Sequence, residues 1–141
     1  MSKSYSQIRF ILHNSLTELE RLSEQLDIAA ELWQLPSRAA LQINLIMDEL
    51  FTNTVSYGVG DATEKRVNIC MDYNGNEVQI VMIDDGHAFD PSLPNDPILD
   101  IPLEERDVGG LGIFLARKYA DKLTYVRENG KNIVKLIKTI T

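Results

Sequence analysis

Cysteine and long apolar runs are scarce in this chain of 141 residues. The single cysteine, Cys70, cannot form an internal disulfide, and this favours a reducing, cytoplasmic setting. No apolar run approaches the roughly 20 residues that a membrane-spanning helix needs. The polar start, Met1–Gln7, leads into no apolar signal core. These absences predict a cytoplasmic protein without a membrane partner.

Basic residues are also in the minority, with 14 Lys and Arg against 21 Asp and Glu, for a net charge of −7. The densest basic groups are Glu64–Arg66 and Arg117–Lys118, and neither forms a basic stripe. A nucleic-acid-binding domain normally carries a basic face, so direct nucleic-acid binding is not expected. A nucleotide polyphosphate is still a possible ligand, because magnesium and backbone amides can supply the positive field.

Apolar periodicity divides the chain into helices and strands without a linker or an internal repeat. In chain order we expect a strand at 6–14, helices at 15 to about 35 and 36 to about 57, strands at 66–73 and 77–83, a helix from 109 to about 120, and strands at 123–126 and 133–138. Ser15 and Glu18 have capping-box spacing, Pro36 suits a first helical turn, and Gly58 and Gly60 suit a helix end.

Two dipeptides, Asn74-Gly75 and Asn129-Gly130, predict tight hairpin turns. Strands joined by hairpins and separated by helical stretches indicate an α+β fold. We predict a single domain over residues 1–141, a two-layer sandwich. Its mostly antiparallel sheet of about five strands would pack on three helices.

Glu49 and Asn53 lie four residues apart on the second expected helix. Residues at this spacing share one face, here at the edge of the apolar arc. An amide oxygen suits magnesium beside a triphosphate because it adds no negative charge. A glutamate one turn away suits a general base. Such a pair is also common as a solvated or capping pair, so the spacing alone leaves both interpretations open.

The run Asp84-Asp85-Gly86 follows a buried strand. A carboxylate there can accept a hydrogen bond from the exocyclic amine of adenine, which guanine does not offer at that position. Gly86 would let a flat ring approach the backbone. An ordinary turn also explains these three residues, because Asp-Asp-Gly is common after a strand.

A third pattern, Gly109-Gly110-Leu111-Gly112, opens a helix. Free amides at a helix start bind phosphate, although a merely flexible helix start fits too. The P-loop signature is absent. Residues 90–108 carry four prolines and six acidic residues without periodicity, and a loop of this length predicts a lid or, alternatively, a surface excursion. Arg106 within it either clamps phosphate or balances neighbouring carboxylates.

The order of these patterns resembles the three nucleotide-binding boxes of the GHKL (Bergerat-fold) ATPase superfamily. Within it, the segments Asp48–Gly58, Asp84–Pro91 and Gly109–Asp121 look like those of the small anti-sigma-factor serine-protein kinases. The resemblance covers essentially the whole chain. The resemblance implies ATP and Mg2+ as cofactors, with residues 90–108 as the ATP lid.

By this resemblance Asn53 is the magnesium ligand and Glu49 the catalytic base. Asp84 contacts adenine, Gly86 and Ala88 line the base pocket, and the cofactor-binding set is completed by residues that meet the phosphates, which are Gly109, Gly110, Leu111 and Gly112. Three positions depart from the family pattern: Ala88 replaces a glycine, Val108 replaces a glycine, and Lys131-Asn132 replaces Gly-Thr. A contact of the usual hydroxyl with the base would then come from the Asn132 amide.

The implied function is an ATP- and magnesium-dependent serine-protein kinase. It would phosphorylate a small anti-sigma antagonist of the STAS fold and hold a sigma factor reversibly near the lid and the second helix. Such kinases are commonly homodimers. Two rivals stay open: an ATP-sensing binding switch with negligible phosphoryl transfer, and a detached histidine-kinase catalytic domain. The second is weakened because no helix pair with a phosphoacceptor histidine precedes the domain.

Overall fold

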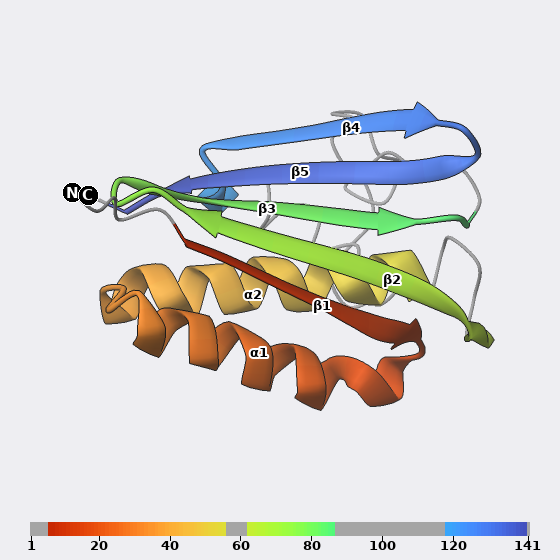
Figure 1. The fold of residues 1–141 in the computed structure, drawn as a ribbon, viewed down its shortest axis with the longest axis horizontal. Coiled ribbons are helices and arrows are strands. Elements are labelled where there is room, and N and C mark those ends of the chain that lie inside the picture. The colour runs from red at the N-terminus through yellow and green to blue at the C-terminus, as the bar shows by residue number, and fades with distance from the viewer. Residues whose placement is uncertain (1–5, 56–61, 87–117, 141) are drawn as a thin grey trace, which may run out of the picture.

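The structure is a computed structural model, and it describes residues 6–55, 62–86 and 118–140. In chain order the elements are β1 (Ser6–Asn14), the 3-10 turn η1 (Leu16–Glu18), α1 (Leu19–Leu32), α2 (Ser37–Asn53), β2 (Ala62–Tyr73), β3 (Glu77–Asp84), β4 (Lys122–Glu128) and β5 (Lys131–Thr139). The five strands form one sheet in the order β1-β2-β3-β5-β4, and every neighbouring pair is antiparallel. Both helices lie on the same face of this sheet (Figure 1). The predicted α+β sandwich is confirmed.

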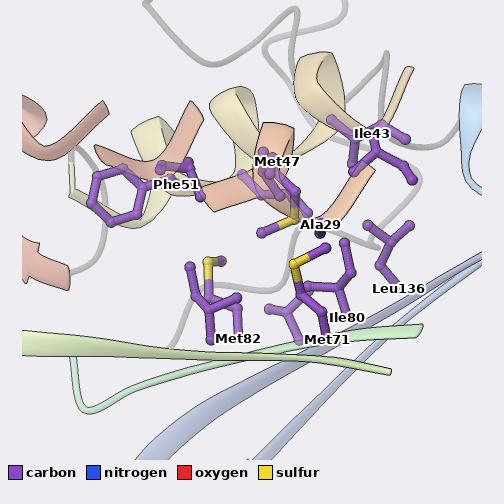
Figure 2. Packing of buried hydrophobic residues seen from close by; sticks show 14 of the residues in the cluster. Ala29, Ile43, Met47, Phe51, Met71, Ile80, Met82 and Leu136 are labelled. Carbon is purple, nitrogen blue, oxygen red and sulfur yellow. The ribbon is translucent and has the colours of Figure 1, made fainter. Parts of the chain in front are cut away.

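The core lies between the helices and the sheet. On β3, Val78, Ile80 and Met82 alternate with half-buried residues and are at most 2% exposed, because successive side chains on a strand point to opposite faces. Met47 and Phe51 of α2 point from the helical layer toward Met82 and its neighbours (Figure 2). This burial anchors the side of α2 that faces the sheet.

The start of the helical layer differs in detail from the predicted capping box. Ser15 caps the first turn, since its Oγ accepts from the Thr17 N–H at 3.3 Å, but that turn is the 3-10 segment η1. The Glu18 carboxylate accepts from the His13 N–H at 2.8 Å rather than from Ser15. The Ser15 N–H is already engaged, because it donates to the His13 carbonyl.

The junction between α1 and α2 matches the predicted boundary near Trp33–Leu35. Gln34 has a φ of 53° and reverses the chain after α1. Pro36 is the residue before the first turn of α2 rather than a member of it. At its other end α2 continues into a π-helical turn at Thr54 and Val55. The expected end near Tyr57, with Gly58 and Gly60, lies outside the described residues.

The two hairpins test the turn predictions. Strands β4 and β5 pair up to Glu128 and Lys131, so the loop is Asn129-Gly130, and both residues have positive φ, as predicted. The β2–β3 loop is shifted by one residue from the prediction. Tyr73 pairs with Val78, and the central residues are Gly75 and Asn76. Only Gly75 has positive φ, which is the pattern of a II′ turn with glycine first.

Two α-helices, α1 and α2, are seen within the described ranges. Of the third expected helix, only Lys118, Tyr119 and Ala120 are described, and the first two of these are helical. The predicted lid at 90–108 and the glycine-rich segment 109–112 lie outside the described residues. No helix in the described part of the chain is long and apolar enough to cross a membrane.

Candidate functional site

Three segments reach the same end of the molecule. There α2 ends, β3 ends, and the hairpin between β4 and β5 turns (Figure 1, right side). This brings Glu49 and Asn53 of α2 to the same end as Asp84 of β3. In the sequence, the β2–β3 hairpin separates Asn53 from Asp84. The antiparallel pairing of the strands and the direction of α2 bring their two elements to the same end.

Asn53 is completely buried, and the polar atoms of its side chain lack hydrogen bonds to the rest of the described chain. Among the described residues, no hydrogen-bond partner meets its Nδ2 or its Oδ1. A buried donor or acceptor without a partner costs about 1–3 kcal/mol. Native interiors rarely leave both ends of an amide in this state, so the side chain is suited to a ligand that supplies the missing partners.

Asp48 and Glu49 form a pair of adjacent, half-buried carboxylates. Burial raises the pKa of Asp48, and its Oδ1 has no hydrogen-bond partner among the described residues. Burial also raises the pKa of Glu49, and the neighbouring charge of Asp48 adds to the effect. A raised pKa makes the Glu49 carboxylate a stronger proton acceptor, which is the property that a general base needs.

Asp84 is 5% exposed and closes its own turn. Its Oδ1 accepts from the Gly86 N–H at 2.8 Å and from Asn132 Nδ2 at 3.0 Å. The ordinary-turn interpretation of Asp84-Asp85-Gly86 is therefore correct as far as it goes. The two hydrogen bonds also hold the carboxylate in one orientation.

The Asn132 amide donates from its Nδ2 to Asp84, and its expected contact with the base stays a prediction. Its Oδ1 accepts from the Tyr125 hydroxyl at 2.6 Å and from Arg127 at 3.0 Å. Arg127 also donates to the Gly86 carbonyl at 2.6 Å. Sequence reasoning missed Tyr125 and Arg127. The signal was the Asn129-Gly130 turn, whose register places Arg127 opposite Asn132.

Comparison with known proteins identifies the family. The histidine kinase-like ATPase domain profile matches residues 13–138, which is most of the chain. The chain belongs to the histidine kinase-like ATPase domain family. The resemblance to the GHKL superfamily is thereby confirmed, and membership of this family implies ATP binding.

A curated relative supports the kinase assignment. The chain is 28% identical over 96 residues to the serine/threonine-protein kinase BtrW of Bordetella bronchiseptica, and the match covers 68% of each protein. The chain is therefore related to a protein kinase, in agreement with the predicted likeness to the anti-sigma-factor kinases.

Two solved structures share the fold. The structure of the RsbU and RsbW domains of Rv1364c from Mycobacterium tuberculosis superposes with a TM-score of 0.68 at 13% identity, over 94% of this chain and 32% of that one. The histidine kinase domain of the blue-light activated histidine kinase EL346 from Erythrobacter litoralis gives a TM-score of 0.50 at 16% identity, over 89% of this chain and 60% of that one. The chain thus spans only part of both structures.

The described residues hold part of the predicted site. Glu49 and Asn53 belong to α2, Asp84 is the last residue of β3 and Gly86 follows it, and α2 and β3 end on the same side of the molecule (Figure 1). Ala88 and the predicted phosphate contacts lie outside the described residues, as does Arg106. Their roles, and those of the four described residues, stay predictions.

Proposed function

We propose that this protein is an ATP- and magnesium-dependent serine-protein kinase of the anti-sigma type. The observation that supports this most strongly is Asn53, fully buried with both polar atoms unpartnered among the described residues, one turn from Glu49. Kinship to a serine/threonine-protein kinase supports the reaction class.

Asn53 fits a magnesium ion by its chemistry. The ion prefers oxygen ligands and takes few from the protein, leaving other positions to water and substrate phosphates. The amide oxygen is neutral, so it does not repel a triphosphate. Magnesium, when bound, supplies positive charge to the phosphates of the nucleotide.

Glu49 is the proposed catalytic base. It would accept the proton of a serine hydroxyl while that oxygen forms a bond to the γ-phosphorus and the bond to the departing ADP oxygen breaks. Partial burial and the adjacent Asp48 raise the pKa of Glu49, so its carboxylate holds a proton more readily than an ordinary glutamate.

The rest of the nucleotide would bind on either side of this pair. Asp84 would accept a hydrogen bond from the adenine amine, and Gly86 and Ala88 would line the base pocket. The phosphates would meet the backbone amides of the glycine-rich segment, which comprises Gly109, Gly110, Leu111 and Gly112.

The proposed partners follow from the anti-sigma likeness. The serine would belong to an antagonist of the STAS fold, and the kinase would also hold a sigma factor, in the cytoplasm and as a homodimer. An ATP-sensing switch without phosphoryl transfer is the competing function, and the first experiment below separates the two.

Transfer of labelled phosphate from ATP to STAS-domain proteins, with magnesium present, tests the kinase. We expect transfer by the wild type and a loss of at least about 100-fold in Glu49→Ala, the lower range for removal of a general base. Glu24→Ala, an exposed glutamate of α1, is the matched control and should transfer normally. Nucleotide binding without any Glu49-dependent transfer would favour the switch instead.

Magnesium dependence of ATP affinity tests Asn53. In Asn53→Ala we expect the gain in ATP affinity that magnesium provides to fall at least about tenfold. Removal of even an outer-shell partner of a metal site commonly lowers metal affinity by that factor. Calorimetric titration with ATP, with and without magnesium, measures it. Asn44→Ala removes the same side chain from the same helix, where it bonds Ser23 and Asp27, and should keep the magnesium effect. Full magnesium assistance in Asn53→Ala would show that the ligand assignment is wrong.

A further inference from the structure

Three polar residues form a row across β3, β5 and β4. In the sheet register Asp84 is paired with Asn132, and Asn132 is paired with Arg127. We propose that Arg127, aided by Tyr125, is a positioning residue that sets the nucleobase selectivity of Asp84. The inference rests on the proposed nucleotide site and adds the residues that determine its specificity.

The argument begins with the orientation of the Asn132 amide. An amide side chain has an acceptor end and a donor end, and its two orientations differ only in the hydrogen bonds they make. The Asn132 Oδ1 accepts from the Tyr125 hydroxyl and from the Arg127 guanidinium, and the guanidinium can only donate. A flipped amide would turn its NH2 toward the guanidinium and its oxygen toward the Asp84 carboxylate. Tyr125 and Arg127 therefore lock the Nδ2 end on Asp84.

This lock determines what Asp84 offers to a ligand. Its Oδ1 receives two hydrogen bonds, from Gly86 and Asn132. No described residue donates a hydrogen bond to its Oδ2. An ionised carboxylate only accepts, so the remaining oxygen suits a base that presents an amine and repels one that presents a carbonyl oxygen. Adenine carries an amine at its 6-position, and hypoxanthine carries an oxygen there.

Arg127 holds the other side of the turn as well. Its guanidinium donates to the Gly86 carbonyl at 2.6 Å, while the Gly86 N–H is held by Asp84. Both backbone polar groups of Gly86 are therefore held by hydrogen bonds. The bond from the charged guanidinium of Arg127 is stronger than one between neutral groups. The strand β4 thus fixes the backbone against which a flat base would lie.

The test compares ATP with inosine triphosphate, which differs at the 6-position of the base. We expect the wild type to bind ATP at least about tenfold more tightly. In Arg127→Met that ratio should fall about tenfold, through weaker ATP binding, because a bond to a charged group is lost from the support of Asp84. Tyr125→Phe should lower the ratio by a smaller factor, since Arg127 still holds the amide.

A control separates positioning from general effects. Lys122→Met removes an exposed cation from the same strand, and it should weaken both triphosphates equally or not at all. If part of the Arg127→Met protein is unfolded, the amounts of ATP and of inosine triphosphate bound fall together, and the ratio of the two affinities does not change. An unchanged ratio in both Arg127→Met and Tyr125→Phe overturns the positioning inference alone. A wild type that binds neither triphosphate overturns the proposed function, and the inference with it.

Discussion

At the scale of single residues, the proposed site is made of polar and charged groups whose burial lowers the stability of the folded protein. Asn53 is buried without partners among the described residues, and burial raises the pKa of both Asp48 and Glu49. Charged or polar groups in such settings cost stability in the absence of a ligand. Functional sites commonly accept this cost, so these residues should trade stability against activity.

Glu49→Gln tests this trade at neutral and acid pH. Since the pKa of Glu49 is raised, the folded state binds its proton more tightly than the unfolded chain, and stability falls as pH rises from the ordinary value of 4.5 through the raised one. At neutral pH the free energy of unfolding of Glu49→Gln should therefore be higher than that of the wild type by about 0.5 kcal/mol. The gain is modest because solvent screens the charge of a half-exposed group.

Urea unfolding at neutral pH and below pH ~4 measures the effect, because the advantage should disappear once the wild-type carboxyl is protonated in both states. Glu24→Gln, on the exposed face of α1, controls for charge alone. If Glu49→Gln is less stable than the wild type at neutral pH, or keeps the same stability gain in acid, the pKa of Glu49 is not raised by folding.

At the scale of elements, Glu18 joins the end of β1 to the start of the helical layer. Its carboxylate accepts from the His13 N–H and from Arg21, each at 2.8 Å. Burial alone raises the pKa of Glu18, but the His13 hydrogen bond and the Arg21 charge outweigh it, so the pKa is lowered overall. The ionised form is therefore part of the folded connection.

Glu18→Gln should lower the free energy of unfolding by about 1.5 kcal/mol at neutral pH, the scale of one hydrogen bond to a charged group. A depressed pKa contributes stability above the ordinary value of 4.5, and that contribution is lost as pH falls through the folded value. The difference from wild type should thus shrink in acid. Denaturant midpoints across this range measure it, with Glu20→Gln on the exposed side as control. A pH-independent difference would argue against a role for the charge.

At the scale of the whole molecule, one core joins the two layers. It takes side chains from both helices and from four of the five strands, among them Leu136 of β5, which is 1% exposed. The sheet face that meets α2 also carries Asp84 and Asn132, so the core supports the end of the sheet where the proposed site lies.

Leu136→Ala should lower the free energy of unfolding by about 2–5 kcal/mol, because it removes buried methyl groups and leaves a cavity. Leu41 of α2 is 61% exposed and serves as the matched control. Its replacement by alanine should change stability by less than about 0.5 kcal/mol. Thermal and urea unfolding of both variants check this. Equal losses would show that Leu136 does not belong to a tightly packed core.

By itself the sequence determined the features that depend on neighbouring residues. Periodicity located the strands and the first two helices, and Asn129-Gly130 set the last hairpin, since φ preferences and alternation act locally. The turn at Gly75-Asn76 was missed by one residue, because the Asn74 side chain accepts from the N–H groups of Asn76 and Glu77 and so shifts the loop.

Tertiary structure alone decided which distant residues meet. Asp84 and Asn132 lie 48 positions apart, and only the placement of β5 beside β3 brings them within 3.0 Å. The same strand order decided that the Asn132 amide supports Asp84 and that Arg127 reaches Gly86. Burial of Asn53 without a described partner was likewise invisible in the sequence. Spacing along a chain fixes faces, whereas partners across a sheet depend on strand order and register.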